Sequence, residues 1–133
     1  MKNKGFTLIE LLAVIILLAL IAIISTPIIV NIIGTSKEKA YENQKKIIED
    51  SAKRWVADNP DVVEDEGRKI NIGSGVNAIR VYIEELKTEG YLSSNNQIEN
   101  PKTKEPMEGC VIISEDTSYN QYKYEYHESD SCS

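Results

Sequence analysis

Few residues in this chain of 133 could carry out catalytic or metal-binding chemistry. His127 is the only histidine, and Glu125 and Ser129 lie near it in the sequence without fixing a nucleophile, a base and an orienting group in one geometry. Two cysteines and one distant histidine do not make a zinc site. We therefore predict no catalytic residue, no metal site and no cofactor, and we expect that the protein is not an enzyme.

Glu10 is the one titratable residue in an unusual setting. It is the only charged residue from Phe6 to Ile33, and every residue from Leu11 to Ile24 is apolar. These apolar residues follow no 3.6-residue period, which is typical of a helix surrounded by lipid or by protein. An acid costs roughly 2.5–3.5 kcal/mol at the centre of a membrane helix and somewhat less near its end. Because no base in this segment can neutralise Glu10, we expect its partner to come from elsewhere.

The element that must position Glu10 is a helix long enough to cross a membrane. The segment 6–33 would extend about 42 Å, beyond the roughly 30 Å of a hydrocarbon core. A secretory signal peptide would explain Lys2 and Lys4, but the apolar stretch is too long and no convincing cleavage site follows it. An uncleaved single-pass anchor would explain the length but not the acid. A buried core helix is excluded, because the rest of the chain is too small to surround a rod of this length.

The charge of the chain is concentrated outside the apolar segment. The formal net charge is −6, from 15 Lys and Arg against 21 Asp and Glu. Residues 1–33 hold only Lys2, Lys4 and Glu10, so the remainder carries −7. We therefore expect no nucleic-acid partner for this acidic part of the chain. A hydrophobic content of 41% is enough for one small domain but not for two.

The run KGFTLIELL, residues 4–12, resembles the processing signal of type IV pilins and the related pseudopilins. In that family a membrane aspartyl peptidase cuts after the glycine and methylates the new amino terminus. The resemblance implies cleavage after Gly5, N-methylation of Phe6 and a role for Glu10 in assembly. Pro27 stands where the family usually has a helix-kinking proline, and the resemblance implies that the helix loosens or extends there.

The resemblance also supplies a partner for Glu10. Cleavage creates a cationic amine at Phe6, and Glu10 of one subunit can pair with that amine on its neighbour. Breaking one partner of a pair in a low-dielectric setting typically costs about 3–5 kcal/mol. The implied function is a structural subunit of a type IV pilus-like filament (fimbrium). The implied partners are the prepilin peptidase and methyltransferase, a membrane assembly platform, the lipid bilayer of the bacterial cytoplasmic membrane before assembly, and other pilin subunits at the cell surface afterwards.

Two alternatives stay open at the level of sequence. The first is a pseudopilin of a type II secretion or competence DNA-uptake system, whose fibre is short. The second is a signal-anchored surface binding domain that never polymerises. The first shares the processing signal, so the sequence separates it poorly from a pilin. The second would keep residues 1–5 and lack N-methylation.

The helix is expected to continue beyond the apolar segment. Tyr41, Gln44, Ile48, Ala52 and Trp55 recur at spacings of three and four, and proline disfavours helical geometry at Asn59. We predict supporting ion pairs between acids and bases four residues apart: Glu42–Lys46, Glu49–Lys53 and Asp50–Arg54. The predicted organisation is a cleaved leader at 1–5, a transmembrane and filament-core helix at 6–33, the amphipathic half of the same helix at 34–59, and a globular head at 60–133.

The predicted fold class is α+β and pilin-like, with one long N-terminal helix packed against a small head. In the head we expect an exposed acidic loop at 58–66, a turn at 73–75, a short helix ending at Gly90, and an antiparallel hairpin from Gly109 onwards. Apolar residues at helical spacing mark the expected short helix: Val76, Ile79, Ile83 and Leu86. The hairpin would turn at 115–118. The residues that alternate with charged ones after it predict a half-buried strand: Tyr122, Tyr124 and Tyr126.

Cys110 and Cys132 are the only cysteines. An even pair outside the membrane, in a head with a modest core, indicates one disulfide. Metal binding is the competing interpretation. The pilin family often ties down its C-terminal region in this way.

Overall fold

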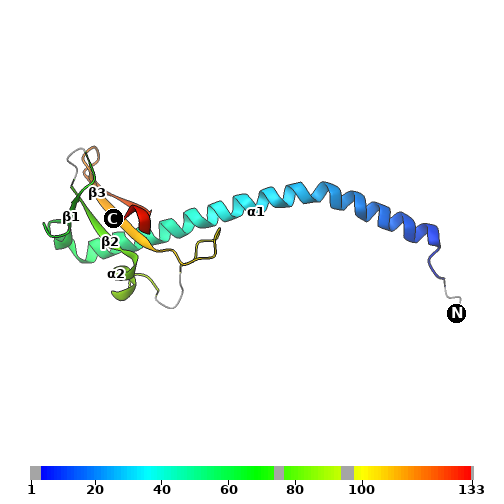
Figure 1. The fold of residues 1–133 in the computed structure, drawn as a ribbon, viewed down its shortest axis with the longest axis horizontal. Helices are drawn as coiled ribbons and strands as arrows, with labels where there is room; N and C mark the ends of the chain where they lie inside the picture. Colours follow the sequence, from blue (N-terminus) through cyan, green and yellow to red (C-terminus); the bar gives the residue numbers. More distant parts are fainter. Residues whose placement is uncertain (1–3, 74–76, 94–97, 133) are drawn as a thin grey trace. The chain divides into compact units, whose positions relative to one another are not determined.

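The computed structural model describes residues 4–73, 77–93 and 98–132. The long helix is α1, Leu8–Asp58, and the chain divides into two units, Met1–Lys37 and Glu38–Ser133. The predicted end of the helix is confirmed: the N–H of Asn59 donates to the carbonyl of Trp55 at 3.0 Å, and Pro60 starts the next element. The predicted α+β class is confirmed too, with a long helix, a short helix and an antiparallel sheet (Figure 1).

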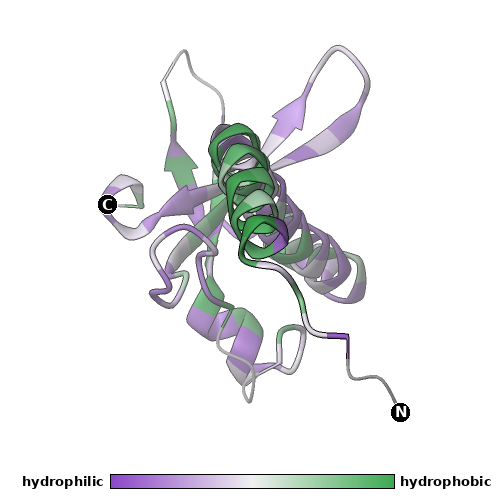
Figure 2. Ribbon diagram, turned by 90° about the vertical axis from the view of Figure 1, so that its right-hand side faces the viewer, coloured by the Kyte–Doolittle hydropathy of each residue, from purple (hydrophilic) through white to green (hydrophobic). Residues whose placement is uncertain are grey.

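In the first unit, α1 exposes apolar side chains in every direction. An 18-residue window of this helix has a mean hydropathy of 3.1, and none of that window is buried. Figure 2 accordingly colours this stretch green turn after turn. Within the described residues, α1 is the one helix long and apolar enough to cross a membrane. A helix that is hydrophobic all round requires an apolar environment.

The second unit contains a four-stranded antiparallel sheet with the order β1-β2-β3-β4. The strands are β1 (Lys69–Asn71), β2 (Asn77–Tyr82), β3 (Gly109–Asp116) and β4 (Gln121–Glu128). The helix α2 (Ile83–Thr88) follows β2, and two single turns, η1 (Pro60–Val63) and η2 (Ser129–Ser131), flank the sheet in sequence. The predicted C-terminal hairpin is confirmed, with its turn at 117–120 instead of 115–118.

The core lies between one face of the sheet and the part of α1 from Glu38 onwards. In β2 and β3 the pleat places Ile79, Val81, Val111 and Ile113 in the core, with the half-buried Arg80 and Ile112 between them. Ala78 and Cys110, next to these core residues, are buried as well. From α1, every third or fourth residue reaches this core. The largest buried side chains are Trp55, Ile48, Ile79, Ile83, Leu86 and Ile113.

The helix predicted over 76–90 is wrong in its first half. The structure places residues 77–82 in β2, and the helix is only Ile83–Thr88. Ile79 and Ile83 are four residues apart, a spacing that fits both a helix and a strand, whereas Val81 between them fits only the strand. The predicted cap is confirmed, because Gly90 has a left-handed φ of 85°. Val76 and residues 74–75 of the predicted turn lie outside the described residues.

The three ion pairs predicted along α1 are also wrong. Glu42 pairs with Lys45 at 3.4 Å, and Arg54 donates to the hydroxyl of Ser51 and the carbonyl of Tyr91. Glu49 accepts a hydrogen bond from the main-chain N–H of Tyr126. Contacts with β4 and with Tyr91, and a different pair within α1, therefore replace the predicted pairs.

Two other expectations are met in part. The acids of the loop at 58–66 are exposed, but Val62 and Val63 pack against the core. On β4 the burial of the tyrosines is graded: Tyr126 is 8% exposed, Tyr124 is half-buried and Tyr122 is 45% exposed. The tyrosine row is thus a core face only at its C-terminal end.

Candidate processing and assembly site

The N-terminus of α1 is closed by a reciprocal contact between Thr7 and Glu10. The main-chain N–H of Thr7 donates to Glu10 Oε2 at 2.9 Å, and the main-chain N–H of Glu10 donates to Thr7 Oγ1 at 3.3 Å. The N–H of Leu11 then makes the first helical hydrogen bond, to the carbonyl of Thr7 at 3.2 Å. This is a capping box, in which two main-chain donors that the helix leaves unpaired are satisfied by side chains.

The capping box corrects the expectation that Glu10 has no partner in its own segment. That expectation considered only bases, whereas a main-chain N–H at a helix N-terminus also stabilises a carboxylate. The signal was present in the sequence, since Thr7 and Glu10 are spaced as S/T-x-x-E immediately before an apolar run. Glu10 is therefore held in a defined position in a single chain.

The residues before the helix are accessible. Residues 4–7 have no regular secondary structure, Gly5 has nothing within 4 Å of where a side chain would start, and Phe6 is 89% exposed. A peptidase needs an accessible main chain outside a helix, and the bond between Gly5 and Phe6 meets this requirement. Cleavage there would place the new amine one residue before the capping threonine.

Pro27 lies inside α1, which continues through it. The proline ring removes the donor that would reach the carbonyl of Ile23. Just before it, Ser25 Oγ donates to the carbonyl of Ile21 at 2.8 Å and Thr26 Oγ1 donates to that of Ala22 at 2.7 Å. These bonds satisfy both hydroxyls without water, which a lipid environment requires. The loosening expected at Pro27 stays a prediction.

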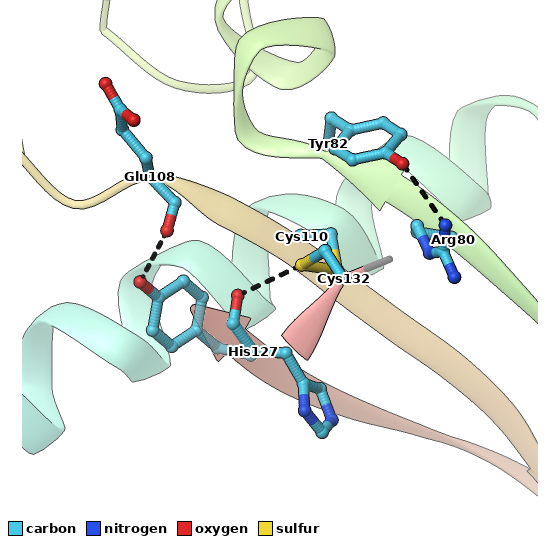
Figure 3. The surroundings of a disulfide bond; sticks show 7 residues. Arg80, Tyr82, Glu108, Cys110, His127 and Cys132 are labelled. Carbon is cyan, nitrogen blue, oxygen red and sulfur yellow. Dashed lines mark hydrogen bonds between the residues drawn. A yellow bond between two sulfur atoms is a disulfide. The ribbon is translucent and has the colours of Figure 1, made fainter. Parts of the chain in front are cut away.

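The head offers no comparable chemical site within the described residues. No group of three or more His, Cys, Asp or Glu side chains there could hold a metal ion. Cys110 and Cys132 are joined by a disulfide, which connects β3 to the end of η2 (Figure 3). One of its sulfur atoms lies 3.4 Å from the main-chain oxygen of His127, whose imidazole points away from the disulfide (Figure 3).

Two tyrosine hydroxyls connect the sheet to its surroundings. Tyr126 donates to the carbonyl of Glu108 at 2.8 Å, and burial raises the pKa of Tyr126 to about 12. Tyr41 on α1 donates to the carboxylate of Glu128 at 2.9 Å. Burial first, and then this hydrogen bond, raise the pKa of Tyr41 to about 12 as well. Both groups stay neutral at physiological pH. The Tyr41 bond holds β4 to α1, and the Tyr126 bond holds β4 to the segment before β3.

Comparison with known proteins concerns the N-terminus. The profile of the prokaryotic N-terminal methylation motif matches residues 1–26, a range that includes Gly5, Phe6 and Glu10 but not Pro27. No curated protein and no solved structure matches the chain. The motif implies processing by prepilin peptidase, and together with the apolar helix it fits anchoring in a membrane. The chain thus carries, over its first 26 residues, the prepilin signal of type IV pilins and pseudopilins.

Proposed function

We propose that the protein is a structural subunit of a type IV pilus-like extracellular filament. Prepilin peptidase cleaves it after Gly5, its new N-terminus at Phe6 is methylated, and an assembly platform in the membrane adds it to the filament through α1. The observation that carries this proposal is the methylation motif, which extends into a helix whose apolar surface is exposed.

The exposed surface of α1 argues against a monomer in water. Nearly every large apolar side chain from Phe6 to Ile33 is at least half exposed. Burial of one such side chain contributes roughly 1.5–3 kcal/mol, so the whole segment represents tens of kcal/mol that only lipid or other helices can supply. The bilayer provides this environment before assembly and the neighbouring subunits provide it afterwards.

Glu10 gives the assembly its register in this proposal. In the single chain its carboxylate is held by the N–H of Thr7 and by the positive end of the helix dipole, so insertion into the membrane is tolerable. A methylated amine on the neighbouring subunit carries a full charge and is the stronger partner. The carboxylate therefore exchanges a local contact for one between subunits when the filament grows.

Two substitutions separate the charge of Glu10 from its capping contact. Glu10→Gln keeps a side-chain oxygen that can accept from Thr7, but it has no charge. Thr7→Val removes the hydroxyl but leaves the carboxylate. We expect both variants to be cleaved, and only Thr7→Val to assemble.

The measurements are the intact mass of the mature chain and electron microscopy of the cells. A mass that retains residues 1–5 would assign the chain to the signal-anchored alternative and reject the proposal. Normal filaments from Glu10→Gln would show that charge pairing does not drive assembly. Short structures confined to the cell envelope, in place of long surface filaments, would assign the chain to a pseudopilin system.

A further inference from the structure

Three lysines form a stripe along the exposed side of α1 in the second unit. Lys39, Lys46 and Lys53 are spaced by seven residues, and all three are exposed. Seven residues are nearly two helical turns, so the three side chains share one side of the helix. This side lies opposite the one that buries Ile48 and Trp55. The stripe, from Lys39 to Lys53, is about 21 Å long at 1.5 Å per residue.

The lysine stripe has no partner within the described residues. None of the three ammonium groups makes an ion pair, a hydrogen bond or a ring contact there. Of the acids near the stripe, Glu42 pairs with Lys45 and Glu49 accepts from the N–H of Tyr126. Asp50 is exposed between Lys46 and Lys53 but makes no ion pair with either of them in the described residues. In a chain with six more acids than bases, three adjacent free cations on one helix face are a specific feature.

An acidic cavity lies elsewhere on the same head. It has a volume of about 460 Å³ and lies between the segment 100–108 and the end of β4. Three of its lining residues are acids: Glu105, Glu108 and Glu128. Of these three carboxylates, only that of Glu128 has a partner among the described residues, the hydroxyl of Tyr41. In Figure 3 the Glu108 carboxylate points away from the disulfide, while its main-chain carbonyl accepts the bond from Tyr126.

The wall of this cavity is held in place. The N–H of Met107 donates to the carbonyl of Ile98 at 2.6 Å, and the N–H of Asn100 donates to the carbonyl of Glu105 at 2.8 Å. Lys102, the basic residue of this segment that faces α1, pairs with Glu38 and lies 4.7 Å from the ring centre of Tyr41. Lys102 is thus engaged with α1. Lys104 is exposed beside Glu105 but makes no ion pair with it, so the carboxylates of Glu105 and Glu108 have no cationic partner among the described residues.

We propose that the lysine stripe of one subunit docks against the acidic cavity of a second copy of this chain. No ion pair joins the stripe to the cavity within one chain. Their charges are complementary, and the two surfaces differ, so the contact is head-to-tail. A head-to-tail contact that does not close into a ring produces an open helical array. This inference rests on the proposed filament and names the surfaces by which its heads meet.

A lipid surface is the competing partner for the lysines. Electrostatic attraction to a membrane fades within a Debye length, about 8 Å at physiological salt. If the helix is perpendicular to the membrane, most of a stripe of about 21 Å lies farther from the lipid surface than one Debye length. The helix cannot lie flat through its apolar side either, because that side is buried under the sheet.

The test uses charge reversal in the full chain, expressed in cells that assemble filaments. In the variant K39E/K46E/K53E, filament yield is expected to fall at least roughly tenfold, because repulsion replaces attraction at every subunit contact. Adding E105K/E108K to the same chain is expected to restore the filaments. The matched control compares the filament yields of two single variants, Lys46→Glu and Lys123→Glu. Lys123 is exposed on β4 and already pairs with Glu125, so Lys46→Glu is expected to lower the yield and Lys123→Glu is not.

A carbodiimide that joins ammonium and carboxylate groups in contact provides a second readout on wild-type filaments. Cross-linked peptides are expected to join Lys46 or its two stripe neighbours to Glu105 or Glu108 of another subunit. Undiminished filaments from the triple variant would overturn the inference and leave the proposed function intact. Loss of filaments without rescue, and without these cross-links, would also overturn it. Absence of filaments from the wild type would instead reject the proposed function.

Discussion

Glu49 on α1 accepts a hydrogen bond from the main-chain N–H of Tyr126 on β4, at 3.0 Å. Among the residues that the structure describes, β4 is an edge strand that pairs with β3 alone. Unpaired donors on an edge strand are sites where another chain can add a strand. The contact therefore holds the sheet to the helix and also removes one donor from the open edge.

Glu49→Ala is expected to lower the free energy of unfolding by about 1.5–3 kcal/mol, the usual value for a hydrogen bond to a charged group. Glu42→Ala is the matched control, because Glu42 lies two turns earlier on α1, is exposed and pairs only with Lys45, at 3.4 Å. We expect a loss below about 1 kcal/mol for this variant. Urea unfolding of the full chain in detergent, followed by the fluorescence of Trp55, measures both. Equal losses would contradict the role given to Glu49.

Removal of the disulfide tests how the C-terminus is held. Cys110 and Cys132 are 22 residues apart, and closing a loop of this size stabilises a folded chain by about 3 kcal/mol in the chain-entropy model. The variant C110S/C132S is expected to lose this amount in urea unfolding. Its stability should not change when a reductant is added, whereas the wild type should fall to the same value. A wild type that is indifferent to the reductant would argue against the bond.

Gly109 begins β3 with a φ of 136°, a conformation that side chains rarely adopt. A Cβ added there would lie 2.1 Å from the main-chain oxygen of His127 on β4. We expect Gly109→Ala to destabilise the head by about 3 kcal/mol or more, because backbone must move on both strands. The control is Gly34→Ala in α1, where nothing lies within 4 Å, and helix content should rise slightly. Similar melting temperatures for the two variants would contradict this account.

The raised pKa of Tyr41 predicts how stability changes in alkali. The ordinary pKa is 10.0 and the folded value is about 12, so the folded chain holds this proton more tightly. The stabilisation is fully present below pH 10 and is lost as the pH rises to about 12. Tyr41→Phe should make the fall in stability between pH 10 and 12 shallower. The control, Tyr119→Phe, should leave this fall unchanged because Tyr119 is exposed. Unfolding curves across this range check the difference, and identical slopes for all three chains would contradict it.

The long-range elements of the head were the hardest to predict. The extent of α1 followed from local rules, since its apolar segment and Asn59-Pro60 are unambiguous in sequence. β2 did not, because Ile79 and Ile83 fit two periodicities, and pairing with β1 and β3 makes the strand favourable. β1 is three residues long and has no pattern of its own.

The same distinction applies to the candidate site. Gly5, Phe6 and Glu10 could be proposed from one continuous motif, and their roles stay predictions. The capping contact of Thr7 was missed because only charges were considered as partners of Glu10. The lysine stripe could not be recognised from sequence, because the acids expected to pair with it are drawn away by residues such as Tyr126, 77 positions from Glu49.

The order of the strands has a consequence for how the head folds. Among the described residues the strands pair in chain order, so the sheet is a meander, but residues 83–108 lie between β2 and β3. Folding is fast when contacts join residues close in sequence, and it slows as the intervening loops lengthen. The hairpins β1-β2 and β3-β4 should therefore form first, and the pairing of β2 with β3 and the docking of the sheet on α1 should limit the rate at which the head folds.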